Sequence, residues 1–266
     1  MTGSSRREED ESASSTATAF YDHPEWYDIL HAEGTAKEVD GLERMNTRFG
    51  RGGRRWLEPA CGTGRFLLLL ARRGYLPTGY DINPHCLRYA KDRLKRAGLR
   101  ASVVEADMAS FERPDAFDFA FNTINTFRHL LDEAEVDAHL ERTASSLKAG
   151  GLYVVGVDLA DYELGFHEEE RWTARRGSIE ITHLMMAEPP NRRTRRERII
   201  NHITVTTPTR ERYFESVYDL RSYDFDEWLA LIDRSPFEIA ATCDFQWREI
   251  DLSPEHRDFN FVLRKR

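Results

Sequence analysis

The sequence has little of what marks a secreted, metal-binding or membrane-spanning protein. Its 266 residues include three cysteines, Cys61, Cys86 and Cys243, whose odd number and wide spacing provide neither a disulfide framework nor a metal site. No apolar run approaches the length that crosses a bilayer, and the N-terminus lacks the apolar core of a signal peptide. We therefore expect a cytoplasmic protein with no bound metal and no membrane partner.

The sequence also lacks the positive charge that is typical of nucleic-acid-binding proteins. Its formal net charge is −8 at pH 7, whereas a protein that follows a phosphate backbone carries a basic surface. The main exception is a basic run from Asn191 to Arg198. We interpret this run as a solvated hairpin tip, with contact to RNA or an acidic partner as the alternative. A small-molecule partner is the favoured hypothesis.

Hydrophobic patterning divides the chain into three parts. Residues 1–18 are polar and serine-rich and predict a disordered leader, whereas residues 19–53 are aromatic-rich and predict a helical lid. From residue 54 to residue 266, strands alternate with helices, which predicts an α/β fold with a Rossmann-like, mostly parallel seven-stranded sheet. A period of two over about residues 168–223 predicts an antiparallel three-stranded insertion after the fifth strand.

A glycine loop, WLEPACGTGRF (56–66), ends the first expected strand. A phosphate-binding P-loop requires a lysine after its last glycine, and none follows here. A dinucleotide fingerprint requires a third glycine, and Leu67 occupies that position. The third alternative is a ligand without phosphates at Gly62 and Gly64. Glu58 favours it, because a carboxylate attracts an amino group and repels a pyrophosphate.

Acidic residues also follow the second and third expected strands. Asp81 lies nineteen residues after Gly62 (81 − 62), where a carboxylate can accept hydrogen bonds from both hydroxyls of a ribose. Asp107 is placed to accept from the exocyclic amine of an adenine, and Met108 is placed to lie against its ring. Because the carboxyl ends of parallel strands meet at one edge, we expect one site with partners for an amino acid, a ribose and an adenine.

Four segments in this order resemble the motifs of the class I S-adenosylmethionine-dependent methyltransferases. They are LEPACGTGR, GYDINPHCL, VVEADMASF and FDFAFNTINTFRHL. The resemblance implies methyl transfer as the reaction and S-adenosyl-L-methionine as the cofactor. It also implies that the following residues bind the cofactor: Glu58, Ala60, Cys61, Gly62 and Gly64 around the methionine part, Asp81 and Ile82 at the ribose and adenine, Asp107 and Met108 at the adenine, and Asn122 beneath the sulfonium.

His129 follows the fourth expected strand, near the expected position of the methyl group. The sugar N-methyltransferases of antibiotic pathways are similar here, with a tyrosine-rich N-terminal segment, a histidine at this place and an antiparallel insertion. The resemblance implies that His129 is the catalytic base and that Tyr21 or Tyr27 closes over the cofactor. A histidine that titrates near neutral pH can take a proton from an amine or a hydroxyl. In the alternative interpretation, His129 caps the next helix or faces solvent.

The insertion is expected to form the acceptor pocket, because nothing else in the chain covers the site. Its candidate contacts are Trp172, His183, Arg221 and Tyr223. Arg221 resembles the arginine of an LR-x-Y segment in the same subgroup and is suited to a carboxylate or a phosphate. The alternative is that Arg221 is an exposed or salt-bridged strand residue.

The leading functional hypothesis is methylation of a nitrogen or oxygen of a small-molecule acceptor. A non-catalytic S-adenosylmethionine-binding protein and an RNA or protein methyltransferase are the alternatives. A nicotinamide oxidoreductase is disfavoured by Leu67 and Glu58. The sequence determines neither the acceptor nor the oligomeric state, and a homodimer is compatible with it.

Overall fold

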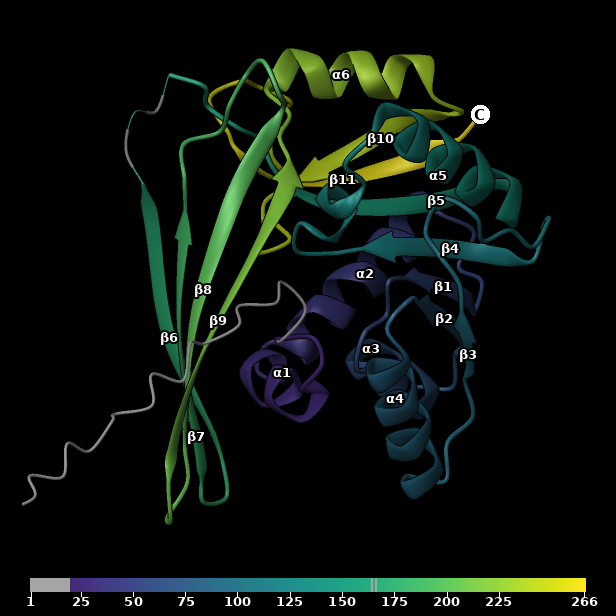
Figure 1. Cartoon of the computed structure of the whole chain (residues 1–266). Coiled ribbons are helices and arrows are strands. Elements are labelled where there is room, and N and C mark those ends of the chain that lie inside the picture. The colour runs from purple at the N-terminus through teal and green to yellow at the C-terminus, as the bar shows by residue number, and fades with distance from the viewer. Residues whose placement is uncertain (1–19, 164, 166) are drawn as a thin grey trace, which may run out of the picture.

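The computed structural model describes residues 20–163, 165 and 167–266. These residues form two sheets with helices around and between them (Figure 1). The predicted leader, residues 1–18, lies outside the described residues. Among the helices of this described part, none is long and apolar enough to cross a membrane.

A seven-stranded sheet, here called the large sheet, has the strand order β10-β11-β5-β4-β1-β2-β3. Strands β1 to β5 are parallel, whereas β11 is antiparallel to both β5 and β10. The prediction of a Rossmann-like, mostly parallel seven-stranded sheet is therefore confirmed. The order reverses between β1 and β4, which is where open α/β sheets bind ligands. The strands are β1 (Arg55–Pro59), β2 (Leu76–Asp81), β3 (Ser102–Glu105), β4 (Phe117–Asn122), β5 (Leu147–Asp158), β10 (Phe237–Cys243) and β11 (Asp258–Lys265).

The helices begin at capping residues that the sequence supplies. Asn83 accepts hydrogen bonds from the backbone of the first turn of α4, and Pro84 occupies the first helical position. Asp224 and Glu227 form a reciprocal capping box at the start of α6. The helices are α1 (Pro24–His31), α2 (Thr35–Phe49), α3 (Arg65–Arg72), α4 (Pro84–Arg96), the 3₁₀ turn η1 (Thr126–His129), α5 (Glu133–Ser146) and α6 (Phe225–Arg234).

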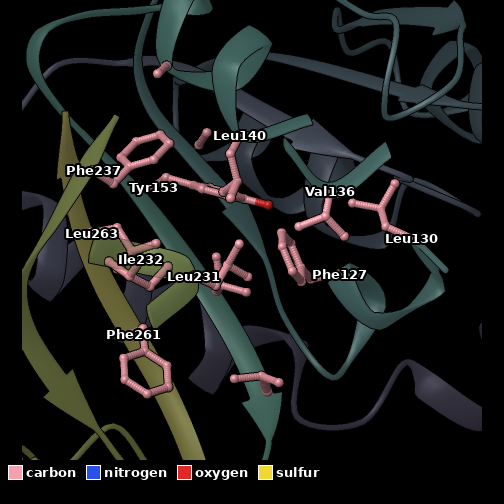
Figure 2. Close-up of a cluster of buried hydrophobic side chains, with 14 of the residues drawn as sticks. Phe127, Leu130, Val136, Leu140, Tyr153, Leu231, Ile232, Phe237, Phe261 and Leu263 are labelled. Carbon is pink, nitrogen blue, oxygen red and sulfur yellow. The ribbon is translucent and has the colours of Figure 1, made fainter. Parts of the chain in front are cut away.

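Helices cover both faces of the large sheet (Figure 1). On one face, α2 and α3 pack Leu42 and Leu70 against the fully buried Trp56. On the other face, α5 and α6 pack around Tyr153, which Figure 2 shows beside Leu140. Burial of each large apolar side chain stabilises the folded state by about 1.5–3 kcal/mol. These two layers hold the strand ends, and thus the predicted site residues, in fixed positions.

The insertion is a sheet of four antiparallel strands, so the prediction of three strands was wrong. This second sheet has the order β6-β7-β8-β9. The strand that was missed, β6, has the sequence EEERWTARR, in which only Trp172 and Ala174 are partly buried. An edge strand pairs through its backbone on one side and needs no continuous apolar face, so no alternation marked it. The strands are β6 (Glu168–Arg176), β7 (Ile179–Ala187), β8 (Arg196–Thr206) and β9 (Glu211–Arg221).

Helix α1 lies between the second sheet and the helices that cover the large sheet (Figure 1). Its apolar residues Trp26, Ile29 and Leu30 are buried in one cluster with Ile181 and Ile203 of the second sheet. The second sheet therefore buries its inner face against α1.

Asp28 connects α1 to two further elements by charge. Its side chain is 2% exposed, and its carboxylate pairs with Arg93 of α4 at 2.6 Å and with Arg176 of β6 at 2.8 Å. The hydroxyl of Tyr89 donates a third hydrogen bond at 3.0 Å. One buried carboxylate thus ties α1 to the large sheet's helices and to the edge of the second sheet.

Candidate functional site

The loop after β1 makes a tight turn into α3. Ala60, Gly62 and Gly64 all have positive φ, at 47°, 49° and 65°. Glycine adopts this conformation without strain, whereas alanine does not. A Cβ on Gly64 would lie 3.0 Å from the Cβ of Ala90 in α4, so close packing also requires glycine there. The loop therefore presents its backbone at the carboxyl end of β1.

Asp81 at the end of β2 holds this loop. Its Oδ2 accepts a hydrogen bond from the backbone N–H of Gly62 at 2.8 Å, and its Oδ1 accepts one from Asn83 at 2.8 Å. Burial raises the pKa of Asp81, and these backbone bonds oppose the rise. Each carboxylate oxygen can accept two hydrogen bonds, so Asp81 retains capacity for a ligand.

Solvent-exposed side chains lie next to Asp81 on the side of β3. β2 and β3 are parallel, with Asp81 opposite Glu105. Ile82 is 66% exposed, and Asp107 is exposed two residues beyond the end of β3, with Met108 partly buried. An apolar side chain and a carboxylate thus stand open beside Asp81. We call the loop 59–64 together with Asp81, Ile82, Asp107 and Met108 the strand-end site.

A pocket adjoins the loop on the side of α1. We call it the inner pocket. It is lined by Tyr27 and His31 of α1, by residues 58–63, by Arg65 and Phe66 of α3, and by residues 121–124 and Thr126. The first expected strand and the expected lid segment thus meet in one cavity.

Glu58 lies buried against this pocket with an unsatisfied oxygen. Its side chain is 6% exposed, and its Oε2 has no hydrogen-bond partner in the part of the chain that the structure describes. Burial raises the pKa of Glu58, and Arg65 opposes the rise. A buried polar atom without a partner is costly in a folded protein. A cationic or hydrogen-bond-donating ligand would satisfy it.

Arg65 was not predicted as a site residue. Its guanidinium forms two hydrogen bonds with Glu38 of α2, at 2.7 and 3.1 Å, and lies 3.9 Å from the ring centre of Phe66. These contacts fix a cation at the wall of the inner pocket. Its position directly after the glycine loop is the sequence signal that points to it.

His31 was also missed. It lines the inner pocket, and its ring centre lies 4.3 Å from that of Tyr27. Burial, Arg65 and His183 lower the pKa of His31 to about 3, so the imidazole is neutral. Tyr27 and His31 are four residues apart and share a helix face, which is a spacing that could have indicated the pair.

Asn122 lies inside the protein, beneath the loop. Its side chain is 2% exposed, its Nδ2 donates to the carbonyl oxygen of Pro59 at 2.8 Å, and its Oδ1 accepts from the hydroxyl of Tyr153. The amide thus bonds to protein groups through both its nitrogen and its oxygen and supports the loop from below.

Tyr21 and His129 meet above the strand ends. The Tyr21 hydroxyl lies 3.5 Å from Nε2 of His129, and both rings are near Tyr218 of β9. The His129 side chain is exposed, yet the surrounding protein and Arg128 lower its pKa to about 4. Burial raises the pKa of Tyr21 well above its usual value. At neutral pH the pair is therefore a neutral imidazole beside a protonated phenol.

The four predicted acceptor contacts fall into two groups. Trp172 and His183 face α1, with ring centres 4.2 Å apart, and Trp172 lies 6.1 Å from His31. Arg221 instead pairs with Glu133 and donates to the carbonyl of Leu131 at 2.7 Å.

Tyr223 is 1% exposed and packs against Trp228 in the core of the large sheet. None of the four predicted contacts lines the inner pocket, but Trp172 and His183 pack behind its residue His31. The structure thus brings Trp172 and His183 to the pocket region and leaves Arg221 and Tyr223 elsewhere.

The basic run from Asn191 to Arg198 is largely paired with acids. Arg192, Arg195, Arg196 and Arg198 form ion pairs with neighbouring carboxylates, among them Glu227, Asp132 and Asp219. These arginines are held by the protein itself and do not present an unneutralised basic stripe.

A doubly wound sheet with a glycine loop after β1 and acids after β2 and β3 defines a class of nucleoside-binding α/β domains. Within that class, residues 57–151 match the family model described as a methyltransferase domain. Residues 57–151 thus resemble a methyltransferase domain, and a solved structure with the same fold has S-adenosylmethionine bound.

Similar proteins extend this comparison. The chain is 32% identical over 123 residues to glycine N-methyltransferase of Rattus norvegicus, covering 41% of this chain and 42% of the relative. It is 30% identical over 135 residues to dTDP-3-amino-3,6-dideoxy-alpha-D-glucopyranose N,N-dimethyltransferase of Streptomyces fradiae, covering 49% and 51%. The chain spans about half the length of the curated relatives it matches.

A solved structure shares the fold over nearly the whole chain. It is S-adenosylmethionine-bound CalS10, an amino pentose methyltransferase from Micromonospora echinaspora. The TM-score is 0.68 at 19% identity, and the match covers 92% of this chain and 96% of that chain. The fold therefore agrees well beyond residues 57–151.

Proposed function

We propose that this protein transfers a methyl group from S-adenosylmethionine to a nitrogen or oxygen of a small molecule, with an amine as the first acceptor to test. The observation that supports this best is that residues 59–63 of the glycine loop belong both to the strand-end site and to the lining of the inner pocket. A cofactor at the strand ends and an acceptor in the pocket would therefore be neighbours. The acceptors named for the two relatives, glycine and an amino sugar, support an amine.

S-adenosylmethionine fits the groups that the strand-end site and the adjoining wall of the inner pocket leave open. The unpartnered oxygen of Glu58 suits its amino group, and the fixed guanidinium of Arg65 suits its carboxylate. Asp81 suits the ribose hydroxyls, and the exposed Ile82 and Asp107 suit the adenine. When bound, the cofactor supplies a methyl group already activated on a sulfonium. The protein then has to position the acceptor and exclude water.

We assign His129 the role of proton acceptor. A neutral imidazole offers an electron pair to the N–H or O–H of the acceptor. The 3.5 Å separation from the Tyr21 hydroxyl is long for a hydrogen bond, so an acceptor can compete for the same nitrogen. Tyr21 retains its proton and is suited to orient the acceptor or the cofactor, and Tyr27 lines the pocket beside it.

Rings from three elements would contact the acceptor. Tyr27 and His31 belong to α1, Trp172 to β6 and His183 to β7. Such rings suit the face of a sugar or another small body with few charges. The paired arginines of the 191–198 hairpin give no support for an RNA acceptor.

Calorimetric titration with S-adenosylhomocysteine tests the cofactor. Micromolar binding is expected for the purified protein, with no binding of NAD. Tight NAD binding without S-adenosylhomocysteine binding would overturn the proposal.

Transfer of labelled methyl groups tests the acceptor. We expect incorporation into an amino sugar nucleotide or a small amine, and none into total RNA or protein. Incorporation into RNA or protein alone would favour the macromolecular alternative. Binding without turnover on any acceptor would favour a non-catalytic protein.

A further inference from the structure

A line of hydrogen bonds runs between the large sheet and α5 and connects the two ends of the strand-end site. At one end, Nδ2 of Asn122 donates to the carbonyl oxygen of Pro59 at 2.8 Å. The Tyr153 hydroxyl donates to Oδ1 of Asn122 and lies 2.7 Å from Nε2 of His139. At the other end, Nδ1 of His139 lies 3.0 Å from the carbonyl oxygen of Met108.

All three side chains of this line are buried. Asn122 is 2% exposed, and Tyr153 and His139 are 0% exposed. Figure 2 shows Tyr153 projecting from β5 among apolar side chains, with its hydroxyl oxygen toward the side that holds Val136. A buried hydrogen bond that loses one partner leaves the other unsatisfied, which is costly.

The two ends of the line fix its direction. Both carbonyl oxygens only accept, so Asn122 must donate through Nδ2 and His139 must donate through Nδ1. Burial lowers the pKa of His139 to about 4, so its Nε2 is an unprotonated acceptor at neutral pH. Oδ1 of Asn122 is also an acceptor. The single hydroxyl proton of Tyr153 can therefore be donated to either of two acceptors, one at a time, and removing this hydroxyl deprives both of their donor.

The line connects two loops that would bind different parts of the cofactor in the proposed function. Pro59 opens the glycine loop, on the methionine side, and Met108 lies on the adenine side. We propose that Tyr153 and His139 are positioning residues that hold the methionine-side loop and the adenine-side loop at the separation the cofactor requires. Neither residue touches the cofactor. This inference rests on the proposed function of the strand-end site.

Tyr153→Phe tests the centre of the line, because it keeps the ring and removes the hydroxyl. S-adenosylhomocysteine contacts both loops, whereas adenosine contacts the adenine side alone. We expect the Kd of S-adenosylhomocysteine to rise about tenfold and the Kd of adenosine to change less than about twofold. A general loss of structure would instead weaken the binding of both ligands together. The readout is therefore the ratio of the Kd of S-adenosylhomocysteine to the Kd of adenosine.

Two substitutions of His139 test its two nitrogens separately. His139→Asn places an amide donor near the position of Nδ1 and removes the partner of Tyr153. His139→Gln places an amide near the position of Nε2 and removes the donor to Met108. If the line acts as a unit, each variant raises the ratio about tenfold, and Tyr153→Phe combined with His139→Asn raises it little further.

Tyr162→Phe is the matched control, because Tyr162 also donates a hydrogen bond, to Glu227 at 2.9 Å, but away from both loops. Its ratio should equal that of the unchanged protein. Circular dichroism and thermal unfolding establish that each variant is folded. Unchanged S-adenosylhomocysteine affinity in folded Tyr153→Phe would overturn this inference alone. Failure of the unchanged protein to bind S-adenosylhomocysteine would overturn the proposed function and this inference with it.

Discussion

The strand-end site and the wall of the inner pocket are built in different ways. The strand-end site uses backbone N–H groups and carboxylates, such as Gly62 and Asp81, that follow strands directly in the sequence. The pocket wall uses rings from α1, and rings of β6 and β7, more than a hundred residues further along the chain, pack behind them. The first is a product of local sequence and sheet order, and the second depends on the packing of α1 against the second sheet.

This difference separates two kinds of specificity. Backbone groups at strand ends bind the cofactor, which is the same molecule whatever the acceptor is. Side chains on an inserted sheet can change without disturbing the strands that hold the cofactor. We therefore expect substitutions at the strand ends to abolish binding of the cofactor, and substitutions near α1 to affect the acceptor and stability.

The largest effect is expected from Asp81→Ala. It removes the acceptor of the Gly62 and Asn83 N–H groups together with the proposed ribose contact. The Kd of S-adenosylhomocysteine should rise at least about 100-fold, measured by calorimetry. Asp219→Ala is the control, since Asp219 pairs with the exposed Arg198. Wild-type affinity in Asp81→Ala would show that the cofactor binds elsewhere.

His129→Asn should separate chemistry from cofactor binding. Without the imidazole, kcat should fall about 100-fold, while the Kd of S-adenosylhomocysteine stays unchanged. Single-turnover assays with the identified acceptor measure the chemical step directly. Near-normal turnover with intact cofactor binding would remove His129 from the mechanism and leave it as a surface residue of η1.

Asp28→Asn weakens the connection between α1 and its neighbours. The substitution removes the charge that pairs with Arg93 and Arg176, of which Arg176 is 48% exposed and thus contributes less. We expect a loss of about 1–3 kcal/mol in the free energy of unfolding in urea, with a raised KM for the acceptor. Asp40→Asn, at an exposed pair with Arg73, should change stability by less than about 0.5 kcal/mol. Equal stability of both variants would contradict the role of Asp28.

The smallest effect concerns acid stability. Burial lowers the pKa of His139 from 6.5 to about 4. The unfolded chain then binds more protons than the folded protein below pH 6.5, so stability falls as the pH decreases from 6.5 toward 4. His139→Asn should lose about 1 kcal/mol less than the unchanged protein between pH 7 and about 5.5, by urea unfolding at both pH values. An identical loss in both proteins would show that other groups carry this dependence.

The sequence was sufficient to predict the parts of the fold that local patterns determine. The alternation of strands and helices predicted the large sheet, and the acids after its strands predicted where polar groups gather. Strand β6 was not predicted, because its pairing with β7 depends on backbone hydrogen bonds and leaves most of its side chains in solvent.

Residues that act through distant partners were not predictable in the same way. Arg65 is held by Glu38, and His139 reaches Met108 through the folded interior. The position of Arg65 after the glycine loop indicates that it lies near the site, but no local pattern shows that Glu38 holds it or that His139 contacts Met108. Arg221 shows the converse: a suggestive sequence position was outweighed by the nearness of Glu133, which no pattern revealed.

The position of α1 between the two sheets has a consequence for the order of folding during synthesis. Helix α1 ends at His31, whereas the last strand that it helps to cover, β9, ends at Arg221. At 5–20 residues per second, the ribosome adds these roughly 190 residues (221 − 31) in about 10–40 s. Through this interval α1 has no completed second sheet to pack against. Its contact with α4 through Asp28 and Arg93 can form earlier, whereas its apolar face is covered only when β7 and β8 are in place, among the last steps of folding.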